Sequence, residues 1–372
     1  MSPIPILDLK FQYQAIENEL WPVLKKIFET SSFILGPEVE ALEKEIEAFT
    51  GASYNLGVSS GSDALLISLM ALDLQPGDEV ITTPFTFFAT VGSILRLYCK
   101  PVFVDIQEDT FNIDAHEIPK VLSQKTKALV PVHLYGQCAE MDEIQKEAPH
   151  LPIIEDAAQA IGAKYKGRSA GSLGLMACFS FYPSKNLGGA TEGGLIATKD
   201  FQLFEKMKMI RNHGSKGGYI HEFLGGNFRL SAIGAAVLRL KMKYLEDWNQ
   251  LRRENAKLYQ KYFQELGLLE SGKIRPPFVA EGNLHTYHQY VIRCEKRDEL
   301  QSYLSSKGIQ TVVYYPKPLH LQPALAHLGY QEGDFPRAEK AAKEVLALPV
   351  YPGLKEEDIR EVATQIRNFY QL

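Results

Sequence analysis

The chain has 372 residues, 45% of them hydrophobic and 23% charged, which is the balance of an ordinary soluble protein with two globular domains. The formal net charge is −5 and no basic run is present, so neither nucleic acid nor an anionic membrane is an expected partner. No uncharged apolar run approaches the roughly 18 residues of a membrane span, and the first residues do not resemble a signal peptide, so we expect a cytoplasmic protein. The four cysteines are dispersed and lack metal-ligand spacing, so we expect no metal site.

From about residue 38 to residue 200 the sequence alternates helical patterns with short β-rich runs. Apolar residues repeat at helical spacing from Val39 to Phe49, and a second helix is predicted over residues 61–72. Strands are predicted at residues 54–59, 79–83, 101–106, 128–133, 152–156 and 177–182. Strands separated by helices predict an α/β fold with a doubly wound, mostly parallel sheet, in which ligands bind at the carboxyl ends of the strands.

After about residue 235 the pattern changes. A long polar helix is predicted over residues 236–266 and reads as a bridge between two domains. The remaining elements are predicted as strands at residues 285–293 and 310–314 and helices at residues 297–307, 336–346 and 356–370. The sequence therefore predicts a large domain over residues 1–245 and a smaller α+β domain over residues 246–372.

The common dinucleotide, triphosphate and zinc-protease motifs are absent, but a phosphate site of another kind is predicted at residues 58–64 (VSSGSDA). Small residues and hydroxyls stand there between a strand and a helix, where free backbone N–H groups and the helix dipole can hold a phosphate. Residues of this type also cap helices, so the motif alone leaves both interpretations open.

Two further segments end predicted strands with chemically active residues. Residues 153–159 (IIEDAAQ) place Asp156 at the edge of the sheet. A buried carboxylate there needs a cation as its partner, such as a protonated pyridine nitrogen. The structural alternative is that Asp156 caps the next helix. Residues 179–189 (FSFYPSKNLGG) place Lys185 among aromatic residues, a proline and a glycine pair. Desolvation in a pocket would make its amine a nucleophile and proton carrier, whereas an isolated lysine is more often a solvated surface residue.

In this order, these motifs resemble the sugar aminotransferases of the DegT/DnrJ/StrS family, a branch of the fold-type I enzymes that use pyridoxal 5′-phosphate (PLP). The resemblance covers essentially the whole chain and implies a large domain with a mostly parallel sheet and a smaller C-terminal α+β domain. Its motifs are residues 33–37 (FILGP), 60–64 (SGSDA), 83–90 (TPFTFFAT), 131–136 (PVHLYG), 155–159 (EDAAQ), the Lys185 segment and 225–229 (GGNFR).

The resemblance implies a role for each matching residue. Lys185 carries the cofactor as a Schiff base and moves the proton, Asp156 pairs with the pyridine nitrogen, and Gln159 touches the phenolic oxygen. Phe87 stacks on the ring face. The remaining cofactor-binding residues implied are Gly61, Ser62, Asp63 and Ser180, together with Asn227, which reaches the phosphate of the neighbouring subunit in a homodimer.

The resemblance also bears on the substrate. Tyr182 precedes Pro183, as in relatives that aminate C3 of the sugar, so we expect transfer from glutamate to a nucleotide-linked 3-keto sugar, favouring a UDP-linked N-acetylhexose or its uronic acid. Arg229, Tyr315 and His320 are candidate substrate residues, although Arg229 in a salt bridge and His320 at a helix cap are the structural alternatives.

Several other functions remain open from the sequence. They are a C4-specific or dTDP-sugar aminotransferase, an amino-acid aminotransferase, a PLP-dependent sugar dehydratase and a regulatory protein on the same fold. The dehydratases of the family carry histidine in place of the lysine, which disfavours that activity here.

Overall fold

A central sheet organises the larger part of the computed structural model, which describes residues 3–372. A four-stranded and a three-stranded ladder are joined by parallel bridges from Leu129 to Ile153 and from Val132 to Asp156. The resulting order is β1 (Tyr54–Val58), β9 (Gly194–Thr198), β8 (Met176–Ser180), β5 (Ile154–Asp156), β4 (Thr126–Leu129), β2 (Glu79–Thr82) and β3 (Lys100–Phe103). β9 runs antiparallel to both of its neighbours, whereas the other pairings between neighbours are parallel. The predicted mostly parallel sheet is confirmed, with β9 as an additional strand that the sequence pattern did not reveal.

Both faces of this sheet are buried, because consecutive residues of each strand enter different cores. Leu195 packs with α2 and α6 side chains in one apolar cluster, and Ile196 packs with α4 and α7 side chains in the other. A strand that is buried on both sides loses the polar alternation of a surface strand and reads as a continuous apolar run. The covering helices are α2 (Pro37–Glu45), α3 (Glu47–Thr50), α4 (Gly61–Ala71), α5 (Ala89–Leu95), α6 (Met141–Glu147) and α7 (Phe201–Ile210).

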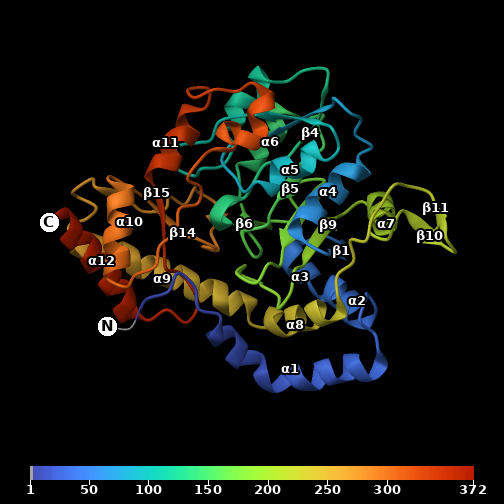
Figure 1. Ribbon diagram of the computed structural model, residues 1–372, viewed down its shortest axis with the longest axis horizontal. Coiled ribbons are helices and arrows are strands. Elements are labelled where there is room, and N and C mark those ends of the chain that lie inside the picture. Colours follow the sequence, from blue (N-terminus) through green and yellow to red (C-terminus); the bar gives the residue numbers. More distant parts are fainter. Residues whose placement is uncertain (1–2) are drawn as a thin grey trace.

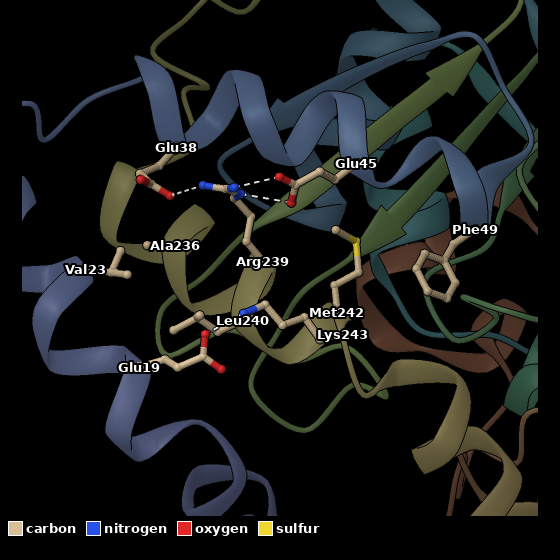
Figure 2. A pocket seen from close by; sticks show the side chains of 10 residues that line it. All are labelled: Glu19, Val23, Glu38, Glu45, Phe49, Ala236, Arg239, Leu240, Met242 and Lys243. Carbon is tan, nitrogen blue, oxygen red and sulfur yellow. Dashed lines mark hydrogen bonds and ion pairs between the residues drawn. The ribbon is translucent and has the colours of Figure 1, made fainter.

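The N-terminal helix α1 (Lys10–Thr30) lies along α8 (Ala232–Met242) at the bottom of Figure 1, outside the sheet and its covering helices. A hollow of about 490 Å³ lies between α1, α2 and α8, and Figure 2 shows the side chains that line it. Arg239 of α8 pairs there with Glu38 and Glu45 of α2, each at 2.6 Å. These two ion pairs hold α2 against α8.

The single bridging helix predicted over residues 236–266 is wrong in one respect. The chain forms α8 and then α9 (Leu245–Glu265), with a break at Lys243 and Tyr244. Neither residue is a glycine or proline, so the sequence carries no local breaker; the ring of Tyr244 stacks on Trp248 at 5.5 Å at the start of the new helix. Tertiary packing, rather than local preference, places the break.

The C-terminal part contains a second core around β14 (Tyr290–Cys294), which pairs with β12 (Ile274–Arg275) and β15 (Val345–Leu348). The helices α10 (Arg297–Ser306), α11 (Pro336–Glu344) and α12 (Glu356–Tyr370) occupy three of the predicted segments. The predicted strand at residues 310–314 is wrong, because only one isolated bridge forms there, from Val312 to Ala347. The predicted helix over residues 336–346 ends early, where the β-branched Val345 begins β15.

The remaining elements are short strands and 3₁₀ helices. The hairpin β10 (Ser215–Gly217) and β11 (Ile220–His221) projects away from the rest of the chain in Figure 1. The others are β6 (Lys164–Tyr165), β7 (Arg168–Ser169), β13 (Asn283–Leu284) and the 3₁₀ helices Ala115–Lys120, Leu134–Gly136, Leu319–Leu321 and Pro323–Leu328. Over residues 3–372, no helix is long and apolar enough to cross a membrane, and no acid, histidine and cysteine cluster suited to a metal ion occurs. The domain boundary at residue 245 stays a prediction.

Candidate active site

The predicted site residues collect at one edge of the sheet. β5 ends at Asp156, β8 ends at Ser180, and β1 leads into Ser59 and the first turn of α4. β1, β5 and β8 point the same way, because β8 is parallel to β5 and antiparallel to β9, which is antiparallel to β1. The carboxyl ends of these strands therefore bring three segments far apart in the sequence to the same place.

The first turn of α4 forms a compact polar cradle. Ser60 caps the helix by accepting a hydrogen bond from the backbone N–H of Asp63 at 3.0 Å. The carboxylate of Asp63 in turn accepts from the hydroxyls of Ser59 at 2.6 Å and Ser60 at 3.0 Å. Asp63 therefore orders the serines of the cradle, while the backbone N–H groups at Gly61 and Ser62 lie at the positive end of the helix, where a phosphate is favoured.

Glycines allow the cradle to close on its neighbours. A Cβ at Gly61 would lie 2.7 Å from the Cβ of Ser180, and a Cβ at Gly194 would lie 2.3 Å from the carbonyl oxygen of Ser60. Ser180 therefore faces the first turn of α4 directly, as its predicted role beside Gly61 requires. Any larger residue at either glycine would push β8 or β9 away from the cradle.

Asp156 is buried, with 5% of its surface exposed, and its carboxylate is held by hydrogen bonds. Thr90 donates to Oδ2 at 2.7 Å and the backbone N–H of Ala158 donates to Oδ1 at 3.3 Å. Burial raises the pKa of Asp156, whereas these hydrogen bonds and the charge of Lys185 lower it. A buried carboxylate of this kind is stabilised by an additional cation, which a protonated ring nitrogen would supply.

The neighbouring Glu155 has a structural role. It is fully buried and accepts hydrogen bonds from three backbone N–H groups, of Gly171, Leu173 and Gly174, at 2.8–2.9 Å. The ring of His133 lies 2.9 Å from its Oε2. His133 therefore serves the scaffold, and only Asp156 of the acidic pair is available to the site.

Lys185 lies in a tight loop just after β8 and is half-buried. Its backbone N–H donates to the carbonyl of Tyr182 at 2.8 Å, and a Cβ at Gly188 would lie 2.1 Å from the carbonyl oxygen of Pro183. Burial lowers the pKa of Lys185 to about 8, while the charge of Asp156 opposes this effect. Near neutral pH a useful fraction of the amine is therefore uncharged and nucleophilic.

A wall of aromatic and amide groups adjoins these residues. Gln159 accepts from the backbone N–H of Tyr135 at 2.7 Å and donates to the hydroxyl of Tyr315 at 3.2 Å. The ring of Phe87, whose side chain is largely exposed, lies 6.4 Å from that of Tyr315. Burial raises the pKa of Tyr315, which keeps its hydroxyl protonated. Phe87, Gln159 and Tyr315 are thus brought together, as a flat ring held between them would require.

Asn227 and Arg229 lie beside the phosphate cradle. Arg229 donates to Asn227 at 2.8 Å and to Asn212 at 3.1 Å, and its backbone bridges to Val58 at the end of β1. Asn227 is exposed, and its contact with a neighbouring subunit stays a prediction. Arg229 makes polar contacts with two asparagines instead of a salt bridge.

His320 lies behind the aromatic wall. It is buried, its Nε2 lies 3.0 Å from Glu339, and its ring packs against Phe335. These contacts give it a clear structural role, and its contact with a sugar stays a prediction.

Sequence reasoning missed Thr90. Its partner Asp156 is 66 positions away, so no local pattern links them. Its place within residues 83–90, a segment that carries the family resemblance, was the one available signal.

The sequence of the chain is similar to those of known proteins over nearly its whole length. The model of the DegT/DnrJ/EryC1/StrS aminotransferase family matches residues 14–367. The chain belongs to this family. It is 50% identical over 371 residues to a "pleiotropic regulatory protein" of Geobacillus stearothermophilus, covering 99% of each chain. It is 40% identical over 368 residues to a UDP-N-acetyl-3-dehydro-alpha-D-glucosamine 3-aminotransferase of Acidithiobacillus ferrooxidans, covering 98% of each chain.

The fold agrees with solved members of the DegT/DnrJ/EryC1/StrS family. DesV of Streptomyces venezuelae, solved with a ketimine intermediate, superimposes with a TM-score of 0.96 at 39% identity, covering 100% of both chains. The fold-type I prediction is thereby confirmed, and so is the prediction of an aminotransferase.

The aminotransferases of this family use PLP, and so does this protein. Its residues fit that group. The glycine-lined cradle matches a phosphate, buried Asp156 matches a ring cation, and the Lys185 amine, with its lowered pKa, matches an aldehyde.

Proposed function

We propose that the protein transfers the amino group of glutamate to the C3 keto group of a nucleotide-linked hexose, most simply a UDP-linked N-acetyl sugar. The observation that carries the proposal is the joint placement of Lys185 and Asp156 at the sheet edge, each altering the pKa of the other. An amine with a lowered pKa beside a buried acid supports proton transfer at neutral pH.

When bound, PLP supplies an electron sink that makes the carbon bearing the transferred nitrogen acidic. The amine of Lys185 would hold the cofactor and, once the amino donor had released it, would be placed to take the proton from the α-carbon of the donor. The same amine would keep that proton within the site and deliver it to the sugar carbon that becomes aminated. Asp156 would keep a proton on the ring nitrogen, and Gly61, Ser62 and Ser180 would hold the phosphate, so that the amine and the reacting carbon stay aligned.

The loop before Lys185 supports C3 as the site of amination. Tyr182 precedes Pro183, and the UDP-linked 3-aminotransferase reported above is 40% identical to this chain. Members that act at C4 often carry histidine at this position. A dTDP-linked sugar is the alternative, because a dTDP-3-amino-3,4,6-trideoxy-alpha-D-glucose transaminase is also 39% identical. The substrate residues that we propose are Arg229, Tyr315 and His320.

A homodimer is part of the proposal. Asn227 is exposed in the segment that follows the hairpin of β10 and β11, and its amide, which accepts from Arg229 through Oδ1, presents Nδ2 for a contact with a second subunit. The name of the 50% identical relative suggests a purely regulatory protein, but the residues of the site argue against that function. Loss of Lys185 or Asp156 would mark such a protein, and both residues are present.

The proposed function is tested with a panel of nucleotide keto-sugars and glutamate carrying an isotopically labelled nitrogen. Mass spectrometry detects the labelled amino sugar, and NMR locates the amine at C3 or C4. Lys185→Ala serves as the control and should abolish turnover while it retains some cofactor without a covalent bond. Labelling of no nucleotide sugar, or of a 2-oxo acid alone, would refute the proposal.

A further inference from the structure

The residue that follows Lys185 is buried and fully engaged by hydrogen bonds. Asn186 is 3% exposed. Its Nδ2 donates to Asn249 Oδ1 at 2.7 Å and to the backbone carbonyl of Thr286 at 3.1 Å. Asn249 belongs to α9 and Thr286 precedes β14, so one amide of the lysine loop contacts two distant elements.

These bonds have a fixed direction. Nδ2 of Asn186 faces two oxygen atoms, and Nδ2 of Asn249 faces the carbonyl oxygen of Ile161 at 3.2 Å, so neither amide can be reversed without loss. The Oδ1 of Asn186 lies 3.2 Å from Nδ1 of His288. Burial lowers the pKa of His288, and a neutral ring that donates from Nδ1 completes the chain from His288 through Asn186 and Asn249 to Ile161.

The chain is tightly enclosed, so its members cannot shift without disturbing the surrounding backbone. A Cβ at Gly162 would lie 2.5 Å from Nδ2 of Asn249, and a Cβ at Gly136 would lie 2.5 Å from the hydroxyl of Thr286. Both glycines also have positive φ angles, +83° and +107°. The backbone beside Asn249 and Thr286 therefore leaves no room for a side chain at either glycine.

The opposite side of the lysine loop is held by another helix. Lys241 of α8 is 7% exposed, and its amine donates to the carbonyl of Gly188 at 2.8 Å and to Gln12 at 3.4 Å. The loop that carries Lys185 is therefore fixed from both sides, by α8 at Gly188 and by α9 at Asn186.

We propose that Asn186 is a positioning residue, which the buried chain from His288 to Asn249 holds in place so that the amine of Lys185 stays in a dry position beside Asp156. The proposal rests on the proposed role of Lys185 as the cofactor anchor. The contact between the lysine loop and α9 thereby affects the reactivity of the Lys185 amine.

Two titratable groups face the amine of Lys185: Asp156 of β5 and His288, which precedes β14. They determine what happens to the pKa of Lys185 when the hydrogen-bonded chain is broken. His288 is neutral and Asp156 favours the charged amine, so burial is what lowers the pKa of Lys185. A loosened loop admits water and raises this pKa. Below the pKa, each unit of increase slows nucleophilic attack by the amine about tenfold.

The test compares two asparagines of the same helix. Asn249→Ala breaks the chain, whereas Asn255→Ala removes another buried amide, which donates to Tyr351 at 2.8 Å, away from the lysine loop. Apoprotein is mixed with PLP, and the rate of borohydride-trapped attachment to Lys185 is measured against pH by mass spectrometry. Both variants should lose similar thermal stability. Only Asn249→Ala should move the midpoint of the attachment rate to higher pH and slow attachment near pH 7 by about tenfold.

A second pair covers the case in which Asn249→Ala does not fold. His288→Asn keeps a donor at the position of Nδ1, and His288→Leu removes it, so only the leucine variant should move the midpoint. Unchanged midpoints in folded Asn249→Ala or His288→Leu protein would overturn the positioning role. Absence of attachment at Lys185 in the unmodified protein would instead refute the proposed function, so the two failures are distinguishable.

Discussion

Thr90 donates a hydrogen bond to Asp156 at 2.7 Å and thereby links α5 to the acid at the end of β5. This bond favours the ionised carboxylate, which must stay charged to hold a proton on the cofactor ring. The Thr90 hydroxyl also lies 3.2 Å from that of Thr86, so the contact is part of a buried polar cluster.

Thr90→Val should therefore impair turnover with little change in the fold. A hydrogen bond to a charged group contributes about 1.5–3 kcal/mol, so kcat should fall about tenfold or more. Because the lost bond lowers the pKa of Asp156, its removal raises that pKa and the acidic limb of the kcat profile should move to higher pH. Thr90→Ser keeps the hydroxyl and should retain the original profile; equal profiles in both variants would contradict the role of this bond.

Asp156→Asn should change two measurements in opposite directions. The charge of Asp156 raises the pKa of Lys185, so its removal should lower that pKa and make cofactor attachment to Lys185 faster at acidic pH. Turnover should nevertheless fall by about 100-fold or more, because the stabilising charge opposite the ring nitrogen is lost. Attachment rates by mass spectrometry and kcat by product assay distinguish these effects, and slower attachment would refute the predicted coupling.

Gly61→Ala should weaken cofactor binding through overpacking. The new methyl group would lie 2.7 Å from the Cβ of Ser180, and such crowding costs about 1–3 kcal/mol. The Kd for PLP, measured by titration of absorbance, should therefore rise about tenfold. Gly92→Ala in α5 is the matched control, because its nearest contact is 3.4 Å from Phe88 and the helix should gain about 0.5–1 kcal/mol. Equal affinities in the two variants would argue against the cradle.

Local sequence was sufficient for much of the sheet and for the position of the site. The strand that ends at Ser180 is apolar from Met176 to Phe179, and two isoleucines precede the acids that end β5, because both faces of the sheet are buried. That signal is present in the local sequence. β9 was missed because only Leu195, Ile196 and Ala197 stand between a glycine pair and a polar turn. A run of three residues is too short to distinguish a strand from a loop.

Contacts between distant residues could not be predicted in the same way. Asn186 and Asn249 are 63 positions apart, and His320 and Glu339 are 19 apart. Nothing in the local sequence distinguishes these side chains from ordinary polar residues, because only the fold brings each pair together. The break between α8 and α9 has the same cause, because the residues at the break have no intrinsic tendency to end a helix.

Lys241→Met should reveal the buried lysine through the pH dependence of stability. Burial lowers the pKa of Lys241 to about 8, from the ordinary value of 10.5, and no acid compensates. Between these values the unfolded chain binds more protons than the folded chain, so the contribution of Lys241 to stability increases as pH rises. From about pH 7 to about pH 9 the increase amounts to about 1 kcal/mol. Urea unfolding of both proteins at the two pH values measures it: the unmodified protein should gain about 1 kcal/mol relative to Lys241→Met, and parallel pH dependences would show that the amine is solvated in the folded state.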